Sequence, residues 1–141
     1  LPSFFNRYGG TAPASPAASA AQSLYGQASA DSAAAESLSG YWVPQVSSKK
    51  VGKDGFDEAS ILQDFQASVS ARPGTLFVLV RSDDFSSFSG PGFWVTLAAT
   101  RFTSAAGANG WCDTEGYGPQ DCYAKRLSHT DGPTGNSVPR G

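Results

Sequence analysis

The feature that most constrains this chain is an alternation of strand and helix patterns that begins at Gly40. Four segments are rich in β-branched and aromatic side chains and read as strands: 41–48, 75–82, 92–102 and 122–130. Two segments between them read as helices: 57–72 and 103–112. In the first of these, Ile61, Leu62, Phe65 and Val69 share one face, and Asp57 is a suitable cap.

The resulting order, β-α-β-β-α-β, is the split pattern of ferredoxin-like folds. It predicts an α+β domain over residues 40–130, with a four-stranded antiparallel sheet in which the strands lie in the order 4-1-3-2. Both helices are then expected on one face of the sheet. The other face would be open and available to a ligand.

The segments on either side of this domain have a different composition. Residues 1–39 are dominated by Ala, Ser, Pro, Gln and Gly, which predicts a flexible linker or arm, with at most a short helix capped at Ser29 or Asp31. Its start carries three apolar aromatic residues that favour self-association: Phe4, Phe5 and Tyr8. The turn-rich segment 131–141 is expected to be a flexible tail.

The first and third strands indicate where a ligand would bind. If the helices cover Val46 and Val95, alternation leaves one outward set: Tyr41, Gln45, Ser47, Trp94 and Thr96. Aromatic rings beside amide and hydroxyl groups suit a carbohydrate, which offers apolar ring faces and hydroxyls. The alternative is that the linker or a partner subunit covers Trp94. Pro44 interrupts the first strand and is expected at a bulge on the covered face.

The two cysteines, Cys112 and Cys122, enclose a short loop that contains Gly116 and Gly118. Their spacing matches no usual zinc pattern and the chain has one histidine, His129, so no metal or cofactor is expected. A disulfide is the preferred interpretation, and it implies an oxidising compartment outside the cytosol. Two buried free thiols are the alternative.

Several functional classes are disfavoured. A net charge of −2 argues against nucleic-acid binding, which needs a basic surface. No apolar run approaches the about 18 residues of a membrane span. Asp83 and Asp84 are adjacent and point apart if extended, and Ser128 beside His129 is adjacency alone, so we expect no catalysis. The chain lacks methionine and is expected to be a mature piece of a longer precursor.

Six motifs in the last two-thirds of the chain resemble an actinobacterial surface-protein family: WVPQVSSK, ILQDF, RSDDFSSF, FWVTL, ANGWC and DCYAKRLS. The chain is similar to the extracellular C-terminal domain of membrane-anchored Ser/Thr protein kinases and to related secreted proteins. No kinase motif occurs in the 141 residues. The resemblance implies an extracellular or cell-surface location.

More distantly, the pattern resembles SPOR domains, which share this topology and bind septal peptidoglycan glycan on the open sheet face. That likeness implies that Gln45 and either Ser47 or Ser48 contact the glycan. The sequence therefore predicts a non-catalytic extracellular module that binds a cell-wall glycan or a related surface ligand. The alternative is a structural or protein-interaction subunit that assembles through its aromatic arm and sheet face.

Overall fold

The computed structural model describes residues 16–141. Its helices and strands follow in the order α1 (Pro16–Glu36), β1 (Trp42–Lys50), α2 (Glu58–Ala71), β2 (Phe77–Arg81), a short 3₁₀ turn η1 (Ser82–Asp84), β3 (Phe93–Ala98), α3 (Ala105–Thr114), β4 (Tyr123–Arg126) and β5 (Ser137–Val138). The predicted mixture of helices and strands is confirmed. The numbers are not, since the described chain has three helices and five strands where two and four were expected.

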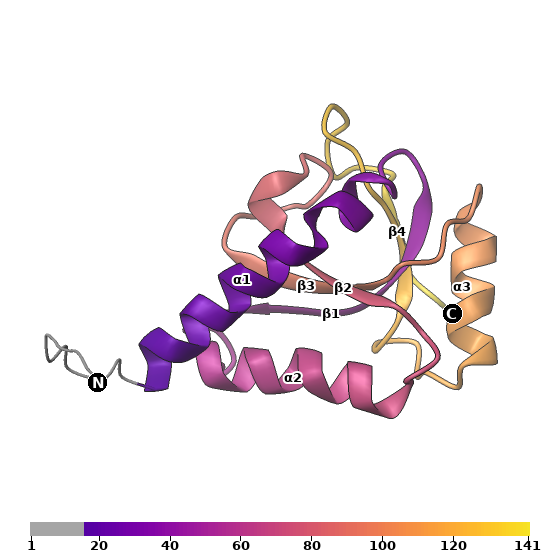
Figure 1. Ribbon diagram of the computed structural model, residues 1–141. Coiled ribbons are helices and arrows are strands. Elements are labelled where there is room, and N and C mark those ends of the chain that lie inside the picture. The colour runs from indigo at the N-terminus through magenta and orange to yellow at the C-terminus, as the bar shows by residue number, and fades with distance from the viewer. Residues whose placement is uncertain (1–15) are drawn as a thin grey trace, which may run out of the picture.

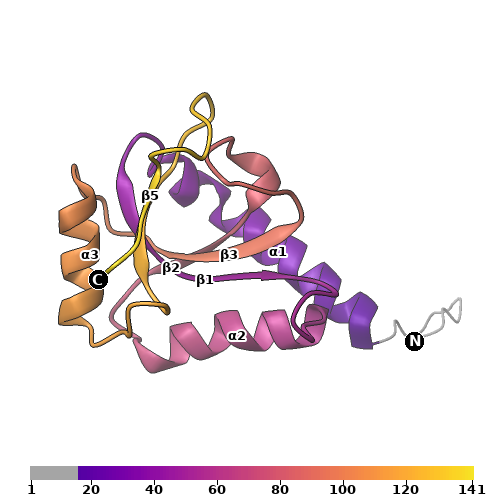
Figure 2. The same ribbon diagram turned by 180° about the vertical axis from the view of Figure 1, so that it is seen from behind.

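The strands form one antiparallel sheet in the order β2-β3-β1-β4-β5 (Figures 1 and 2). The four predicted strands thus keep the expected order, and β5 extends the sheet beyond β4. The prediction of a flexible tail over 131–141 is therefore wrong, because Ser137 and Val138 pair with β4. Arg140 also holds the tail in place by donating to the carbonyls of Tyr117, Gly118 and Cys122.

Helices α2 and α3 cover the same face of the sheet, as the topology predicts (Figure 1). We call this the helix face. Its apolar cluster consists of Leu24, Ile61, Phe65, Phe77, Leu79, Trp94 and Ala98. Asp57 begins α2 as predicted, because its side chain accepts a hydrogen bond from the Ser60 N–H while the Ser60 hydroxyl accepts from the Asp57 N–H.

The opposite face of the sheet is not open, contrary to the prediction. A second apolar cluster lies on it: Ala35, Leu38, Val43, Val78, Val80, Phe85, Val95, Leu97 and Leu127. The cover over this face comes from the loop after β2 through Phe85 and Phe88, from Leu127 after β4, and from the end of α1 through Ala35. Both faces of the sheet are therefore buried over much of their area.

The prediction that residues 1–39 form a linker is wrong for the described part, because Pro16–Glu36 is the helix α1. It lies along the edge strand β2 and also contacts α2 (Figure 1). Ser29 and Asp31, expected as caps, are in its interior. Phe4, Phe5 and Tyr8 lie outside the described residues.

Helix α1 packs through small side chains. Its inward stripe recurs every three or four residues and consists of Ala20, Leu24, Ala28, Asp31 and Ala35. Alanine has the highest helix propensity and lets a helix approach a strand closely. The Asp31 carboxylate accepts a hydrogen bond of 2.9 Å from the Leu79 N–H, so the helix satisfies a backbone donor of the edge strand.

Strand β1 contains a bulge, but it lies between Gln45 and Ser47 and not at Pro44 as predicted. Pro44 lies opposite Ala124, and the register with β3 shifts between Gln45 and Ser47. Since side chains alternate along a strand, one extra residue moves every later side chain to the other face. Gln45 pairs with Leu97 on the opposite face, whereas Ser47 pairs with Thr96 on the helix face.

The predicted disulfide between Cys112 and Cys122 is confirmed, and both cysteines are buried. It joins the end of α3 to the start of β4 across a sequence separation of 10. Reduction is expected to lower the free energy of unfolding by about 3 kcal/mol, because the unfolded chain regains the freedom of that loop. Urea denaturation with and without dithiothreitol measures the difference. The Cys112→Ala/Cys122→Ala variant is the control, since dithiothreitol should not change its midpoint; an unchanged wild-type midpoint once both thiols are free would contradict the prediction.

Candidate functional site

The five residues predicted to form one binding surface are divided between the two faces of the sheet. Trp94 is 6% exposed and lies in the helix-face cluster. Thr96 is also buried and pairs with Leu79 of that cluster. Ser47 is on the helix face and donates to the Asp64 carboxylate of α2. Gln45 lies on the opposite face, and Tyr41 is 37% exposed just before β1. The predicted surface does not form.

The error has two physical causes. Val95 was expected under the helices, but it packs with Leu97 in the cluster on the opposite face, with Phe93 against it. Apolar side chains therefore occupy both sides of β3, and alternation alone does not show which side faces the helices. The bulge in β1 then separates Gln45 from Ser47.

A small polar hollow lies on the opposite face, where the cover of loops is incomplete. Its volume is about 160 Å³, and it is lined by Gln45, Ser48, Ser82, Phe88, Ser89, Gly90, Phe93, Tyr123, Lys125 and Ser137. We call it the Lys125 hollow. Strands β1, β3 and β4 supply its floor, so the side chains that project into it are positioned by the sheet. Gln45 and Ser48, named through the SPOR resemblance, both line it.

Gln45 and Tyr123 are paired across the β1–β4 ladder. The Gln45 amide donates a hydrogen bond of 2.7 Å to the Tyr123 hydroxyl oxygen. Burial raises the pKa of the Tyr123 hydroxyl, and the hydrogen bond from Gln45 opposes part of that rise. The hydroxyl is thus protonated at neutral pH and retains its own hydrogen to donate.

Lys125 is 4% exposed and projects from β4 to the same face as Tyr123. Its ammonium donates to the Ser87 carbonyl at 2.6 Å and to the Ser137 hydroxyl at 2.9 Å. It also lies 4.9 Å from the centre of the Phe88 ring. Burial lowers the pKa of Lys125. Among residues 16–141, no carboxylate lies within ion-pair distance of it.

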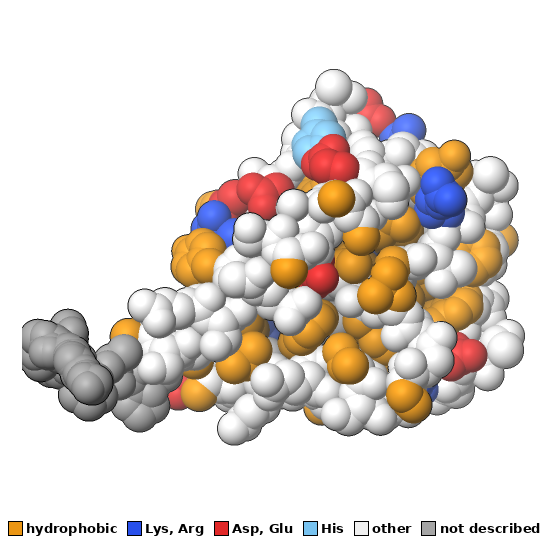
Figure 3. All heavy atoms as spheres, in the orientation of Figure 1, with side chains coloured by type: hydrophobic (Ala, Val, Ile, Leu, Met, Phe, Trp, Pro, Cys, Tyr) orange, Lys and Arg blue, Asp and Glu red, His pale blue; other side chains and the backbone are white. Residues whose placement is uncertain are grey.

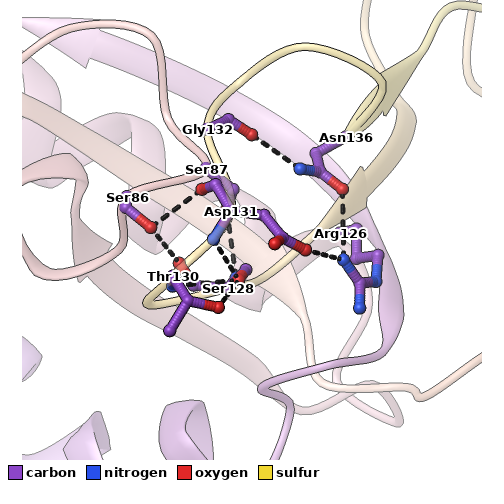
Figure 4. A network of polar contacts seen from close by, with 8 residues as sticks. All are labelled: Ser86, Ser87, Arg126, Ser128, Thr130, Asp131, Gly132 and Asn136. Carbon is purple, nitrogen blue, oxygen red and sulfur yellow. Dashed lines mark hydrogen bonds and ion pairs between the residues drawn. The ribbon is translucent and has the colours of Figure 1, made fainter.

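A polar network holds Ser87 in place against Lys125 (Figure 4). It joins residues of two loops and the last residue of β4: Ser86, Ser87, Arg126, Ser128, Thr130, Asp131, Gly132 and Asn136. The Ser128 N–H donates to the Ser87 hydroxyl, and the Ser86 hydroxyl donates to the Asp131 carbonyl at 2.8 Å. Arg126 pairs with Asp131 at 2.6 Å. Because both loops are tied together, the acceptor at Ser87 is pre-positioned.

A second hollow of about 180 Å³ adjoins the first along the free edge of β1. It shares Gln45, Ser48 and Tyr123 with the Lys125 hollow, and its other walls are Val46, Ser47, Lys49, Gln120 and Asp121. Strand β4 begins at Tyr123, opposite Gln45, so β1 has no partner on this side beyond that point. The hydrogen-bonded pair Gln45–Tyr123 lines both hollows.

A groove of about 880 Å³ lies between α1 and α2. Its lining is mostly apolar and includes Phe65, Val69 and Leu76, and hydrophobic side chains gather over this part of the surface (Figure 3). Two of its polar side chains are already paired, since Gln27 donates to Asp31 and Asp31 accepts from Leu79. The groove therefore suits an apolar surface better than a small polar ligand.

Tyr123, Lys125, Phe88 and Phe93 were not predicted as site residues. One signal was present in the segment YAKRL, where alternation places Tyr123, Lys125 and Leu127 on one face and Ala124 and Arg126 on the other. A lysine between a tyrosine and a leucine on one strand face is unusual for a solvated position. Phe88 is in a loop, and no period in the sequence places it.

Other classes of site are absent from the described part of the chain. Between Pro16 and Gly141, no group of three His, Cys, Asp or Glu side chains is placed to hold a metal ion. No helix within the same range has the length and apolar character to cross a membrane. No protein-family model matches this chain, no curated protein matches it, and no solved structure matches it. A functional assignment therefore rests on the geometry of the site.

Proposed function

We propose that this chain is a non-catalytic extracellular module that binds a saccharide of the cell wall, or of a related surface glycan, in the Lys125 hollow. One observation carries the proposal: the buried polar side chains of Gln45 and Lys125 and the half-buried hydroxyl of Tyr123 line one hollow with the rings of Phe88 and Phe93. Aromatic faces take the apolar side of a sugar ring, and fixed donors orient its oxygens.

The size of the hollow supports a small ligand unit. Small-molecule pockets usually enclose about 300 Å³ or more, whereas this hollow encloses about 160 Å³. It fits one ring of a longer molecule. The adjoining hollow, which shares the Gln45–Tyr123 pair, provides space for the next unit.

Two further features support the other parts of the proposal. The buried disulfide favours an oxidising compartment, and hence a secreted or cell-surface location. No carboxylate is among the residues that line the Lys125 hollow, so the pair of acids that glycoside hydrolysis needs is not supplied there. Binding without chemistry is the function that these residues favour, as it is in the SPOR domains that the sequence resembles.

The test is sedimentation with purified cell-wall sacculi, with and without prior amidase treatment. Replacing Tyr123 with Phe removes one hydroxyl from the hollow and leaves the ring. We expect Tyr123→Phe to lower the affinity for sacculi roughly tenfold, the effect of losing one hydrogen-bonding group. The matched control is Tyr41→Phe, which changes an exposed tyrosine outside the hollow and should bind like the wild type.

Each outcome is distinct. If the wild type fails to pellet with either kind of sacculi, the glycan function is wrong. If Tyr41→Phe weakens binding and Tyr123→Phe does not, the ligand binds elsewhere on the chain.

The apolar groove between α1 and α2 favours the second candidate, a protein-interaction or assembly subunit. Leu76 on its wall is 62% exposed, and Val69 is exposed beside it. Contiguous exposed apolar side chains often mark interaction surfaces. Sedimentation of the protein without sacculi measures its self-association. If assembly is the function, the fraction of protein that sediments is expected to rise with protein concentration.

A further inference from the structure

Lys125 differs from the other cations of the described chain. Four arginines pair with acids: Arg72 with Glu115, Arg81 with Asp83, Arg126 with Asp131 and the largely buried Arg140 with Asp113. The lysines of the 49–53 segment are at the surface or only half-buried. Lys125 alone combines deep burial with neutral partners, Ser87 and Ser137. A buried cation without a counter-charge is costly and therefore calls for a reason.

The hydrogen bonds of the hollow leave donors in excess. A lysine ammonium has three N–H groups, and two of these are used by Ser87 and Ser137. Tyr123 accepts from Gln45, so its own hydroxyl hydrogen has no partner in that pair. The Ser137 hydroxyl likewise accepts from Lys125 and keeps its hydrogen. Because no carboxylate lines the hollow, the missing acceptor is expected from the ligand.

We propose that the saccharide bound in the Lys125 hollow is an acidic sugar whose carboxylate accepts hydrogen bonds from the Lys125 ammonium and the Tyr123 hydroxyl. This inference rests on the proposed function and narrows it to sugars with one carboxylate, such as a hexuronic acid. Lys125 is the one cation among the residues that line the hollow, which matches one negative charge. The Lys50 and Lys53 ammonium groups lie outside the lining, over the Phe93 ring at 5.6 and 5.1 Å from its centre. A phosphate dianion usually recruits several cations or a row of backbone N–H groups.

A carboxylate should bind here because burial has removed water from the Lys125 ammonium without supplying a counter-charge. In the ligand-free protein the buried cation lacks the compensation of a counter-ion, and burial accordingly lowers the pKa of Lys125. An anion at the third N–H makes a charge-assisted hydrogen bond at a site with little water, where such bonds are strongest. The Phe88 ring lies beside the Lys125 ammonium, 4.9 Å from its centre, and limits access of water.

The experiment compares three sugars that differ only at C6: glucuronic acid, its uncharged methyl ester and glucose. NMR titration of the wild-type protein is expected to show that glucuronic acid binds at least tenfold more tightly than glucose. The methyl ester should bind like glucose. Added salt should weaken the binding of glucuronic acid and leave that of glucose unchanged.

Two variants test whether the Lys125 ammonium is the cation that binds the carboxylate. Lys125→Met keeps the length of the side chain and removes the ammonium, so its affinities for the acid and for glucose should become equal. Arg101→Met is the control, since Arg101 is an exposed cation that lines neither hollow; it should retain the tenfold preference. Should Lys125→Met not fold, the ester and the salt series test the same charge on the wild-type protein.

The outcomes separate the two proposals. Equal affinity of the wild type for the acid, the ester and glucose would overturn the acidic-sugar inference and leave saccharide binding in place. The inference also fails if the protein pellets with sacculi but no sugar shifts the resonances of Tyr123 or Lys125. If the protein neither pellets nor responds to a sugar, the proposed function fails with it.

Discussion

A chain that starts at Ser39 is expected not to fold, although its sequence contains all the strands of the predicted domain. The deletion removes α1, which places Leu24 in the helix-face cluster and Ala35 in the cluster on the opposite face. It also removes Leu38, a buried member of that second cluster. The helix thus belongs to both cores.

The size of the effect follows from one residue of α1. Leu24 is fully buried, and replacing a buried leucine by alanine costs about 3–5 kcal/mol. Domains of this size are usually stable by about 5–15 kcal/mol. The deletion removes Leu24, Ala35 and Leu38, and with them the hydrogen bond between the Asp31 carboxylate and the Leu79 N–H. The summed cost in stability therefore approaches or exceeds the whole free energy of folding.

The deletion also exposes the edge of the sheet. Strand β2 is the outer strand, and α1 lies along it. Without the helix, the Leu79 N–H loses its acceptor and an apolar strand edge becomes available to other chains. We expect the shortened protein to aggregate or to give an NMR spectrum without dispersion.

A point variant tests the same claim without removing the helix. Leu24→Ala is expected to lower the free energy of unfolding by about 3–5 kcal/mol in urea. The neighbouring Ser23 is exposed, and Ser23→Ala should change that free energy by less than about 0.5 kcal/mol. A well-dispersed spectrum and cooperative unfolding for the chain that starts at Ser39 would show that α1 is dispensable.

The second large effect is expected for Trp94→Ala. The indole is 6% exposed and packs in the helix-face cluster, where Tyr25 meets it edge-on with ring centres 4.9 Å apart. Truncation of a buried tryptophan removes a large apolar surface and leaves a cavity, at a cost of about 3–5 kcal/mol. Trp94 is therefore a residue of the core and not a platform for a ligand.

Urea denaturation of Trp94→Ala, followed by far-UV circular dichroism, measures this cost. Tyr41→Ala is the control, since Tyr41 belonged to the same predicted surface but is 37% exposed. Its free energy of unfolding should stay within about 1 kcal/mol of the wild type. If the two variants lost similar amounts of unfolding free energy, Trp94 would not stabilise the core as its burial indicates.

Local signals predicted most of the elements correctly. Asp57 and the stripe of Ile61, Leu62 and Phe65 define α2 with no reference to the rest of the chain. The order of the strands followed from the β-α-β-β-α-β succession, because short connections and handedness leave few arrangements. The disulfide followed from the number and spacing of the cysteines.

Helix α1 was missed because its buried stripe consists mostly of alanine. Composition made Ala18–Ala35 resemble a linker, since alanine and serine add little apolar area. The stripe Ala20, Leu24, Ala28 and Ala35 nevertheless recurs at helical spacing. What stabilises the helix is contact with β2 and α2, which no local pattern reveals.

The candidate site was predicted in part. Gln45 lines the hollow, as the alternation in β1 suggested, but Trp94, Thr96 and Ser47 lie on the other face. One bulge accounts for Ser47, and burial of both faces of β3 accounts for Trp94. Lys125 lies on β4, and Ser87, whose carbonyl accepts a hydrogen bond from it, is 38 residues away along the chain.

By itself, the sequence determined which segments become strands and helices, their order in the sheet and the pairing of the cysteines. These follow from short-range periodicity, capping and connection length. Only the tertiary structure decided which face of each strand is covered, that α1 seals the edge of β2, and that Lys125 lies buried among neutral partners. Those features depend on contacts between residues distant in the chain, and a shift of one residue in β1 is enough to exchange the faces.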